Sequence, residues 1–107
     1  MSLEIEQFLH TERLPHMWCA GCGIGIVTGA FLRVLVKLGL KREQTVVVGG
    51  VGCSSRAAGY VDVSSMHTIH GRALAFATGI KMVRPEFTIV VFTGDGDGAA
   101  IGGNHLI

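Results

Sequence analysis

The sequence predicts an α/β fold in which helices flank a parallel sheet. Two short apolar runs rich in β-branched residues, 45–48 and 87–92, have the composition of buried parallel strands. Each run leads into a glycine-rich segment, and stretches with helical spacing precede the first run and separate the two. We expect the second run to be a central strand covered on both faces. With only two clear strand runs, the chain is expected to be an incomplete unit finished by further polypeptide or by another chain.

The composition is that of a globular chain. Of the 107 residues, 49% are hydrophobic and 16% are charged, and the formal net charge is +1. This near-neutral balance lacks the electrostatic footprint of a nucleic-acid-binding protein. The chain has no apolar run of about 18 residues that could span a bilayer, and no basic and apolar signal at its N-terminus. We therefore expect a cytoplasmic protein with neither nucleic acid nor membrane as a partner.

Residues 1–17 are predicted to form an irregular arm, because their apolar residues follow neither a helical nor a strand period. Residues 18–107 are predicted to form one domain, truncated at its C-terminal end. A helix should begin this domain, since apolar residues recur at three- and four-residue steps over 24–38 and Gly39 is a natural C-terminal cap. The expected apolar face of this helix consists of Ile24, Val27, Phe31, Val34, Leu35 and Leu38.

Three cysteines are placed where they can meet. Cys19 and Cys22 form a C-x-x-C pattern at the start of the first helix, and Cys53 follows the first strand. Because the ends of parallel strands converge at one edge of a sheet, we expect Cys53 and the helix start to share that edge. A redox dithiol, a zinc pair, part of an iron–sulfur ligand set and three unrelated thiols are all compatible with this pattern. The absence of an apolar strand before Trp18 disfavours a thioredoxin-like dithiol.

The second predicted strand ends in a glycine loop that carries two carboxylates. The loop consists of Gly94, Asp95, Gly96, Asp97 and Gly98. Its glycines would permit positive φ and close approach of backbone to a ligand, and a helix starting near residue 99 would offer N–H groups to phosphate. The spacing also satisfies the loose dinucleotide fingerprint, but two bare carboxylates would repel a pyrophosphate. A Mg²⁺–diphosphate ligand fits better, and a tight turn with solvated aspartates is the ordinary alternative.

Two histidines precede a second predicted helix. This helix spans 73–83, is small and apolar enough to pack closely on the sheet, and is ended by Pro85. Together with Arg72, His67 and His70 could supply neutral donors and a fixed cation near a diphosphate or an acidic substrate. Taken singly, each histidine is more often a structural residue.

Four motifs in this order resemble the thiamine-diphosphate-binding β subunit of 2-oxoacid:ferredoxin oxidoreductases. They are W-C-A-G-C-G at 18–23, G-V-G-C-S-S-R at 50–56, H-T-I-H-G-R-A-L at 67–74 and G-D-G-D-x-x-x-I-G-G-N-H at 94–105. The likeness extends over nearly the whole chain from residue 18. It implies the N-terminal part of a thiamine-diphosphate-binding fold.

The resemblance also implies roles for individual residues. Asp95 would bind Mg²⁺, and Gly94, Gly96 and Asp97 would shape the diphosphate loop. His67 and His70, the two candidate catalytic residues, would approach the cofactor. The loop that would approach it with them consists of Gly52, Cys53, Ser54 and Ser55. Three of the four ligands to a [4Fe–4S] cluster would be Cys19, Cys22 and Cys53.

The family's later asparagine metal ligand and its fourth cysteine are absent from this sequence, and its catalytic glutamate comes from a partner subunit. The implied activity is oxidative decarboxylation of a 2-oxoacid, 2-oxoglutarate or pyruvate, with coenzyme A to acyl-CoA and CO₂. The implied partners are an α subunit and ferredoxin, which receives the electrons from the cluster. A non-redox thiamine-diphosphate decarboxylase or synthase and a structural zinc-binding subunit are the alternatives.

Overall fold

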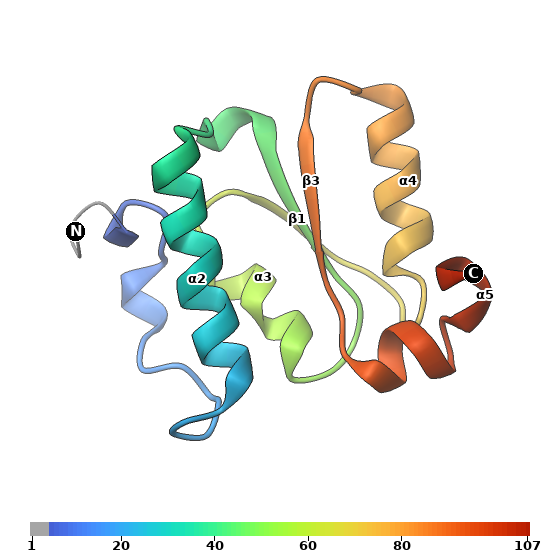
Figure 1. Cartoon of the computed structure of the whole chain (residues 1–107), viewed down its shortest axis with the longest axis horizontal. Coiled ribbons are helices and arrows are strands. Elements are labelled where there is room, and N and C mark those ends of the chain that lie inside the picture. Colours follow the sequence, from blue (N-terminus) through green and yellow to red (C-terminus); the bar gives the residue numbers. More distant parts are fainter. Residues whose placement is uncertain (1–4) are drawn as a thin grey trace.

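A computed structural model describes residues 5–107, so the first four residues of the expected arm lie outside the described part. Within these residues, three strands form a parallel sheet in the order β2-β1-β3. The strands are β1 (Thr45–Gly49), β2 (Ser64–His67) and β3 (Thr88–Phe92). The helices are α2 (Gly23–Leu38), α3 (Ala57–Tyr60), α4 (Ala73–Val83) and α5 (Gly103–Leu106), shown in Figure 1. The predicted α/β fold with a parallel sheet is confirmed.

The central strand of the sheet is β1, which is buried along its whole length. It pairs with β2 from Val46 opposite Ser64, and with β3 from Thr45 opposite Thr88. The sequence predicted β1 and β3 but not β2. This third strand was missed because its four residues, Ser-Ser-Met-His, are mostly polar and all exposed, so it has no apolar run to reveal it.

Within the described residues, β3 lies at an edge of the sheet and not at its centre. Its apolar composition is typical of a strand inside a sheet. Within residues 5–107, however, β3 pairs with β1 along one edge and has no paired strand along its other edge. Residues 88–91 are accordingly half-buried, and only Phe92 is buried. The prediction that β3 is a central strand is therefore wrong for the part of the chain that the structure describes.

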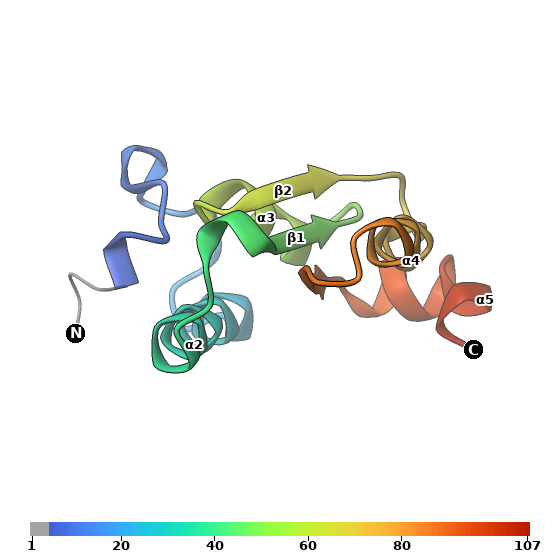
Figure 2. The same ribbon diagram turned by 90° about the horizontal axis from the view of Figure 1, so that it is seen from above.

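The helices form two layers, one on each face of the sheet. Figure 2, which views the molecule from above, shows α2 and α4 on opposite sides of the strands. Val47 points into the core that α2 and α3 cover, whereas Val46 and Val48 point into the core that α4 covers. This alternation is expected of a strand buried on both faces. Among residues 5–107, no helix is both long and apolar enough to cross a membrane.

Helix α2 has the predicted extent, and Gly39 ends it in the left-handed conformation at φ 66°. Its buried side, however, differs from the predicted apolar face. The buried residues are Thr28, Leu32 and Leu35, whereas Val27, Val34 and Leu38 are exposed. Thr28 tolerates burial because its hydroxyl donates to the carbonyl of Ile24 at 2.8 Å. The predicted face is correct at Leu35, which is buried, and at Ile24 and Phe31, which pack against the core. It is wrong at Val27, Val34 and Leu38.

Helix α4 confirms the predicted crossover helix over 73–83. Small residues face the sheet, and Ala73 and Ala77 are buried against the valines of β1. Near the end of the helix, the Nζ of Lys81 donates to the carbonyl of Phe87 at 2.6 Å, which fixes the turn into β3. The helix ends two residues before Pro85, which cannot donate a backbone hydrogen bond.

The described part of the arm is docked against the segment that joins α3 to β2. Leu9 and Val61 form an isolated antiparallel bridge. Asp62 N–H donates to the Phe8 carbonyl at 2.6 Å, and the side chain of Phe8 is buried in the core that α2 covers. A single turn of 3₁₀ helix, Thr11–Arg13, follows. The arm therefore leads the chain to the start of α2 along a fixed path.

Leu35→Ala should destabilise the chain by about 2–4 kcal/mol, because it opens a cavity at a fully buried site. Leu38→Ala, three residues further along the same helix, is the matched control. Leu38 is 66% exposed, and its loss should change the free energy of unfolding by less than about 0.5 kcal/mol. Urea unfolding of the full chain measures both values. Equal losses would contradict the assignment of the buried side of α2.

Candidate functional site

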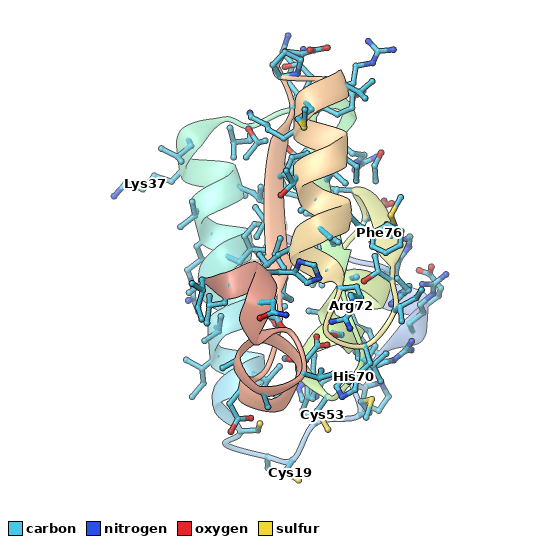
Figure 3. The ribbon with its side chains drawn as sticks, turned by 90° about the vertical axis from the view of Figure 1, so that its right-hand side faces the viewer. Cys19, Lys37, Cys53, His70, Arg72 and Phe76 are labelled. Carbon is cyan, nitrogen blue, oxygen red and sulfur yellow. The ribbon has the colours of Figure 1, made fainter. Side chains whose placement is uncertain are left out.

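The loops that follow the strands meet at one end of the molecule around a cavity of about 470 Å³. Residues 51–54 line it from the end of β1, His70 from the segment between β2 and α4, and residues 93–97 from the end of β3. Figure 3 shows His70 and Cys53 close to each other at this end. The predicted site residues that the structure brings together are Gly52, Cys53, Ser54, His70, Gly94, Asp95, Gly96 and Asp97.

The carboxylate of Asp97 joins these loops. Only 3% of Asp97 is exposed. Its Oδ1 accepts a hydrogen bond from Gly71 N–H at 2.5 Å and lies 3.0 Å from Nδ1 of His70. Its Oδ2 accepts from the hydroxyl of Thr93 at 3.0 Å and from that of Ser55 at 3.5 Å. A single buried side chain therefore connects the loops after β1, β2 and β3.

These contacts determine the charge of Asp97. Burial by itself would raise its pKa, but hydrogen bonds from the backbone of Gly71, the hydroxyl of Thr93, the backbone of Val51 and the ring of His70 outweigh burial and hold the pKa below its ordinary value. An ionised carboxylate can only accept hydrogen bonds, so Nδ1 of His70 must carry the proton between them. The Nε2 of the ring is the nitrogen left for a ligand.

Asp95 differs from Asp97 in its exposure and in its hydrogen bonds. It is exposed at the rim of the cavity. Within residues 5–107, its carboxylate accepts one hydrogen bond, at 2.8 Å from Gly96 N–H, where it caps the turn that follows. Most of its oxygen lone pairs are left for a cation. Mg²⁺ is typically held by one or two protein carboxylates together with phosphate oxygens, and Asp95 suits this kind of ligation.

The backbone of the loop differs from the expectation. A one-turn π-helix, Gly96–Ala100, begins directly after Asp95, so the helical turn starts three residues earlier than predicted. Gly94, Gly96 and Gly98 do not use the positive φ that glycine permits. Because Asp95 caps the N–H of Gly96, the chain passes from β3 into helical geometry without a left-handed residue.

Two glycines of the neighbouring loops do adopt positive φ, Gly52 at 135° and Gly71 at 78°. A Cβ on Gly52 or on Gly96 would meet no atom within 4 Å, whereas a Cβ on Gly98 would come within 2.9 Å of the Thr93 side chain. At Gly52 and Gly96 the backbone is thus open to the cavity, without a side chain to cover it. Gly98 allows the Thr93 side chain to pack closely against the backbone.

The three cysteines lie in two loops at the same end of the molecule, and all three are free thiols. Cys19 and Cys53 are exposed, and Cys22 is half-buried. Figure 3 shows Cys19 and Cys53 at this end. The indole N–H of Trp18 donates to the carbonyl of Cys53 at 2.6 Å, which links the two loops. Even so, no three His, Cys, Asp or Glu side chains of residues 5–107 are close enough together to hold a metal ion.

Some predicted residues lie outside the cavity lining. His67 is exposed at the end of β2, Ser55 is buried beneath the loops, and the guanidinium of Arg72 donates to the carbonyl of Ile101 at 3.1 Å. Sequence reasoning also missed Thr93, whose hydroxyl contacts Asp97. Its only signal was a hydroxyl residue directly before the G-D-G sequence.

The fold and the site define an α/β cofactor-binding domain with its ligand cavity at the carboxyl ends of parallel strands. Residues 50–107 match the family model described as "Thiamine pyrophosphate enzyme, C-terminal TPP binding domain", which covers more than half of the chain. The chain therefore belongs to this family. The predicted thiamine-diphosphate-binding fold is confirmed.

Known proteins are similar over most of the chain. A 2-oxoglutarate synthase subunit KorB from Archaeoglobus fulgidus is 58% identical over 107 residues, which are 100% of this chain and 40% of that protein. A 2-oxoglutarate oxidoreductase subunit KorB from Mycobacterium tuberculosis is 48% identical over 90 residues, 84% of this chain and 24% of that protein. The chain thus spans less than half the length of these relatives.

A solved structure is similar as well. It is the 2-oxoglutarate:ferredoxin oxidoreductase from Magnetococcus marinus with 2-oxoglutarate, coenzyme A and succinyl-CoA bound. The TM-score is 0.89 at 40% sequence identity, and the match covers 95% of this chain and 34% of that one. The described fold is therefore that of part of this larger oxidoreductase chain.

Asp97→Asn should destabilise the chain by about 1–3 kcal/mol, because the amide cannot accept all the hydrogen bonds that the buried carboxylate accepts. Asp95→Asn is the matched control two residues away. Asparagine caps a helical turn about as well as aspartate, so this exposed change should cost less than about 0.5 kcal/mol. Urea unfolding of the full chain compares the two. A loss for Asp95→Asn as large as that for Asp97→Asn would show that burial does not separate their roles.

Proposed function

We propose that this chain is the thiamine-diphosphate-binding part of the β subunit of a 2-oxoacid:ferredoxin oxidoreductase, with 2-oxoglutarate as the favoured substrate. The observation that carries the proposal is the 58% identity to a 2-oxoglutarate synthase subunit over the whole chain. The relatives named for 2-oxoglutarate support the choice of substrate. The reaction would convert the 2-oxoacid and coenzyme A to acyl-CoA and CO₂, in the cytoplasm, with an α subunit and ferredoxin as partners.

The geometry of the cavity supports binding of Mg²⁺ and a diphosphate. Its volume of about 470 Å³ lies within the usual range for small-molecule sites. Asp95 supplies an exposed carboxylate for the metal, and Gly52 and Gly96 leave the backbone open to phosphate oxygens. Thiamine diphosphate would supply the nucleophilic carbon and the electron sink for decarboxylation.

His70 is the side chain best placed to act on a bound ligand. Asp97 holds its Nδ1–H, so the ring is fixed in orientation and its Nε2 is left for a group in the cavity. We assign His70 the role of a fixed hydrogen-bonding partner of the cofactor or of the acidic substrate. We assign Asp97 the role of orienting His70. His67, which the cavity lining does not include, is the weaker of the two catalytic candidates.

We further propose that Cys19, Cys22 and Cys53 are ligands to a [4Fe–4S] cluster, with the fourth ligand from outside residues 5–107. Cys19 and Cys53 lie at the cavity end of the molecule (Figure 3), and Cys22 lines a pocket together with Ser54 and Thr93, which supports this role. In the described geometry, however, the three thiols do not converge as a metal site. That observation favours the second candidate, a non-redox thiamine-diphosphate decarboxylase or synthase, in which the thiols would have no metal to bind.

Asp95→Asn should weaken binding of Mg²⁺ and thiamine diphosphate together by at least about tenfold, because the substitution removes the anionic metal ligand. Titration of the purified complex with the cofactor, at several Mg²⁺ concentrations, measures the change. Glu86→Gln is the control for a lost surface charge, because Glu86 is exposed and forms an ion pair with Arg84, away from the cavity lining. Unchanged cofactor affinity in Asp95→Asn would refute the metal assignment.

Iron, acid-labile sulfide and zinc should be measured in the anaerobically purified native complex. Iron and sulfide near four per chain, as for one [4Fe–4S] cluster, are expected. Cys22→Ala should lower both without unfolding the chain, because the Cys22 side chain makes no capping hydrogen bond to α2. Zinc in place of iron would indicate a structural zinc-binding subunit. A complex without metal at the cysteines would favour the non-redox enzyme.

A further inference from the structure

We propose that Trp18 is the positioning residue that holds the Cys53 loop against the C-x-x-C loop. The inference rests on the proposed function, because it gives a purpose to the joint position of the three thiols. Trp18 is the only tryptophan of the chain and is 8% exposed. Its indole N–H donates to the Cys53 carbonyl at 2.6 Å across 35 residues of sequence. One residue further along the chain is Cys19.

The Trp18 ring is itself firmly placed. It packs edge-on against Tyr60 with the ring centroids 5.2 Å apart, and both rings are buried in the core that α2 covers. The hydroxyl of Tyr60 accepts a hydrogen bond at 2.9 Å from the backbone N–H of Met17. The residue before Trp18 is thus tied to α3 as well. Burial and packing against the Tyr60 ring make the indole the fixed point from which the Cys53 loop is held, and neither requires the Tyr60 hydroxyl.

The Cys53 loop, which accepts the hydrogen bond from Trp18, is itself anchored to the sheet. The Cys53 carbonyl also accepts from Arg56 N–H at 3.3 Å, where the chain turns into the 3₁₀ helix before α3. Ser55 in that turn is buried, and its hydroxyl lies 3.4 Å from the Phe92 carbonyl at the end of β3. The Cys53 backbone therefore has a defined position relative to the cavity.

The C-x-x-C loop has few restraints of its own. Residues 19–21 are exposed, and within the loop Cys22 N–H donates to the Cys19 carbonyl at 3.0 Å. Gly21 adopts a positive φ of 78°, and a Cβ added to it would meet no atom within 4 Å. The positions of Cys19 and Cys22 are thus determined by Trp18 at one end of the loop and by the start of α2 at the other.

If the Trp18 hydrogen bond is lost, the two loops should separate more often and the effective concentration of Cys53 near the other thiols should fall. Disulfide formation reports this concentration. When the full chain is treated with diamide, two thiols lose two protons and two electrons to the N=N bond of the reagent, which becomes a hydrazine, and one S–S bond forms. Peptide mass spectrometry counts the disulfides that contain Cys53 relative to the Cys19–Cys22 disulfide, an internal reference.

Trp18→Phe keeps an aromatic ring but removes the N–H, and the ratio of Cys53 disulfides to the reference should fall about fivefold, the size expected for one part-buried hydrogen bond. Tyr60→Phe is the matched control, because it removes the hydrogen bond to Met17 and leaves the bond to Cys53 intact. Its ratio should stay close to wild type. An equal ratio in Trp18→Phe and wild type would overturn the proposal.

A second replacement separates the hydrogen bond from packing. Benzothienylalanine at position 18 has nearly the shape of tryptophan but carries sulfur in place of the N–H, so it should reproduce the fall even if phenylalanine disturbs the core. A wild-type ratio with this residue would overturn the proposal. The metal content of the native complex is measured separately. A complex without iron, combined with a lowered ratio in both variants, would reject the cluster and leave the positioning role of Trp18 supported.

Discussion

The geometry of the cavity depends on one buried charge, the carboxylate of Asp97. Removing an ionised group from water is costly unless hydrogen bonds replace the water, and here donors from three loops do so. A Cβ on Gly50 would overlap the carboxylate, so Gly50 is required by packing around a charge and not by an unusual backbone conformation. A Cβ on Gly102 would come within 2.6 Å of the backbone carbonyl of Asp97, so Gly102 is required by close packing of backbone.

The two aspartates of the G-D-G-D sequence have different surroundings in the folded chain. Asp97 is buried and holds the loops, whereas Asp95 is exposed and is the carboxylate that we propose as a metal ligand. Without the family resemblance, the residue pattern predicts two carboxylates after a strand and cannot separate them, because their neighbours are nearly the same. The distinction comes from residues remote in sequence, such as Ser55 and Gly71, which folding brings into contact with Asp97.

Local signals in the sequence predicted the fold well. Two apolar runs, the cap at Gly39 and the stop at Pro85 located β1, β3, α2 and α4. Features that depend on what an element packs against in the folded chain were harder to predict from the sequence. The exposed strand β2 has no apolar run, and the periodicity of α2 could not show which of its apolar residues meet the sheet. Convergence of the site was predictable from parallel topology, but the thiol positions and the backbone of the 94–98 loop were not.

The unpaired side of β3 has a consequence for the behaviour of this chain on its own. Within residues 5–107, no strand covers that side, and the exposed backbone groups run beside half-buried Ile89, Val90 and Val91. A regular strand with apolar side chains and free N–H and C=O groups is a template for pairing with any other extended segment. Isolated copies at high concentration would therefore tend to aggregate edge to edge, unless another polypeptide occupies that side of the sheet first.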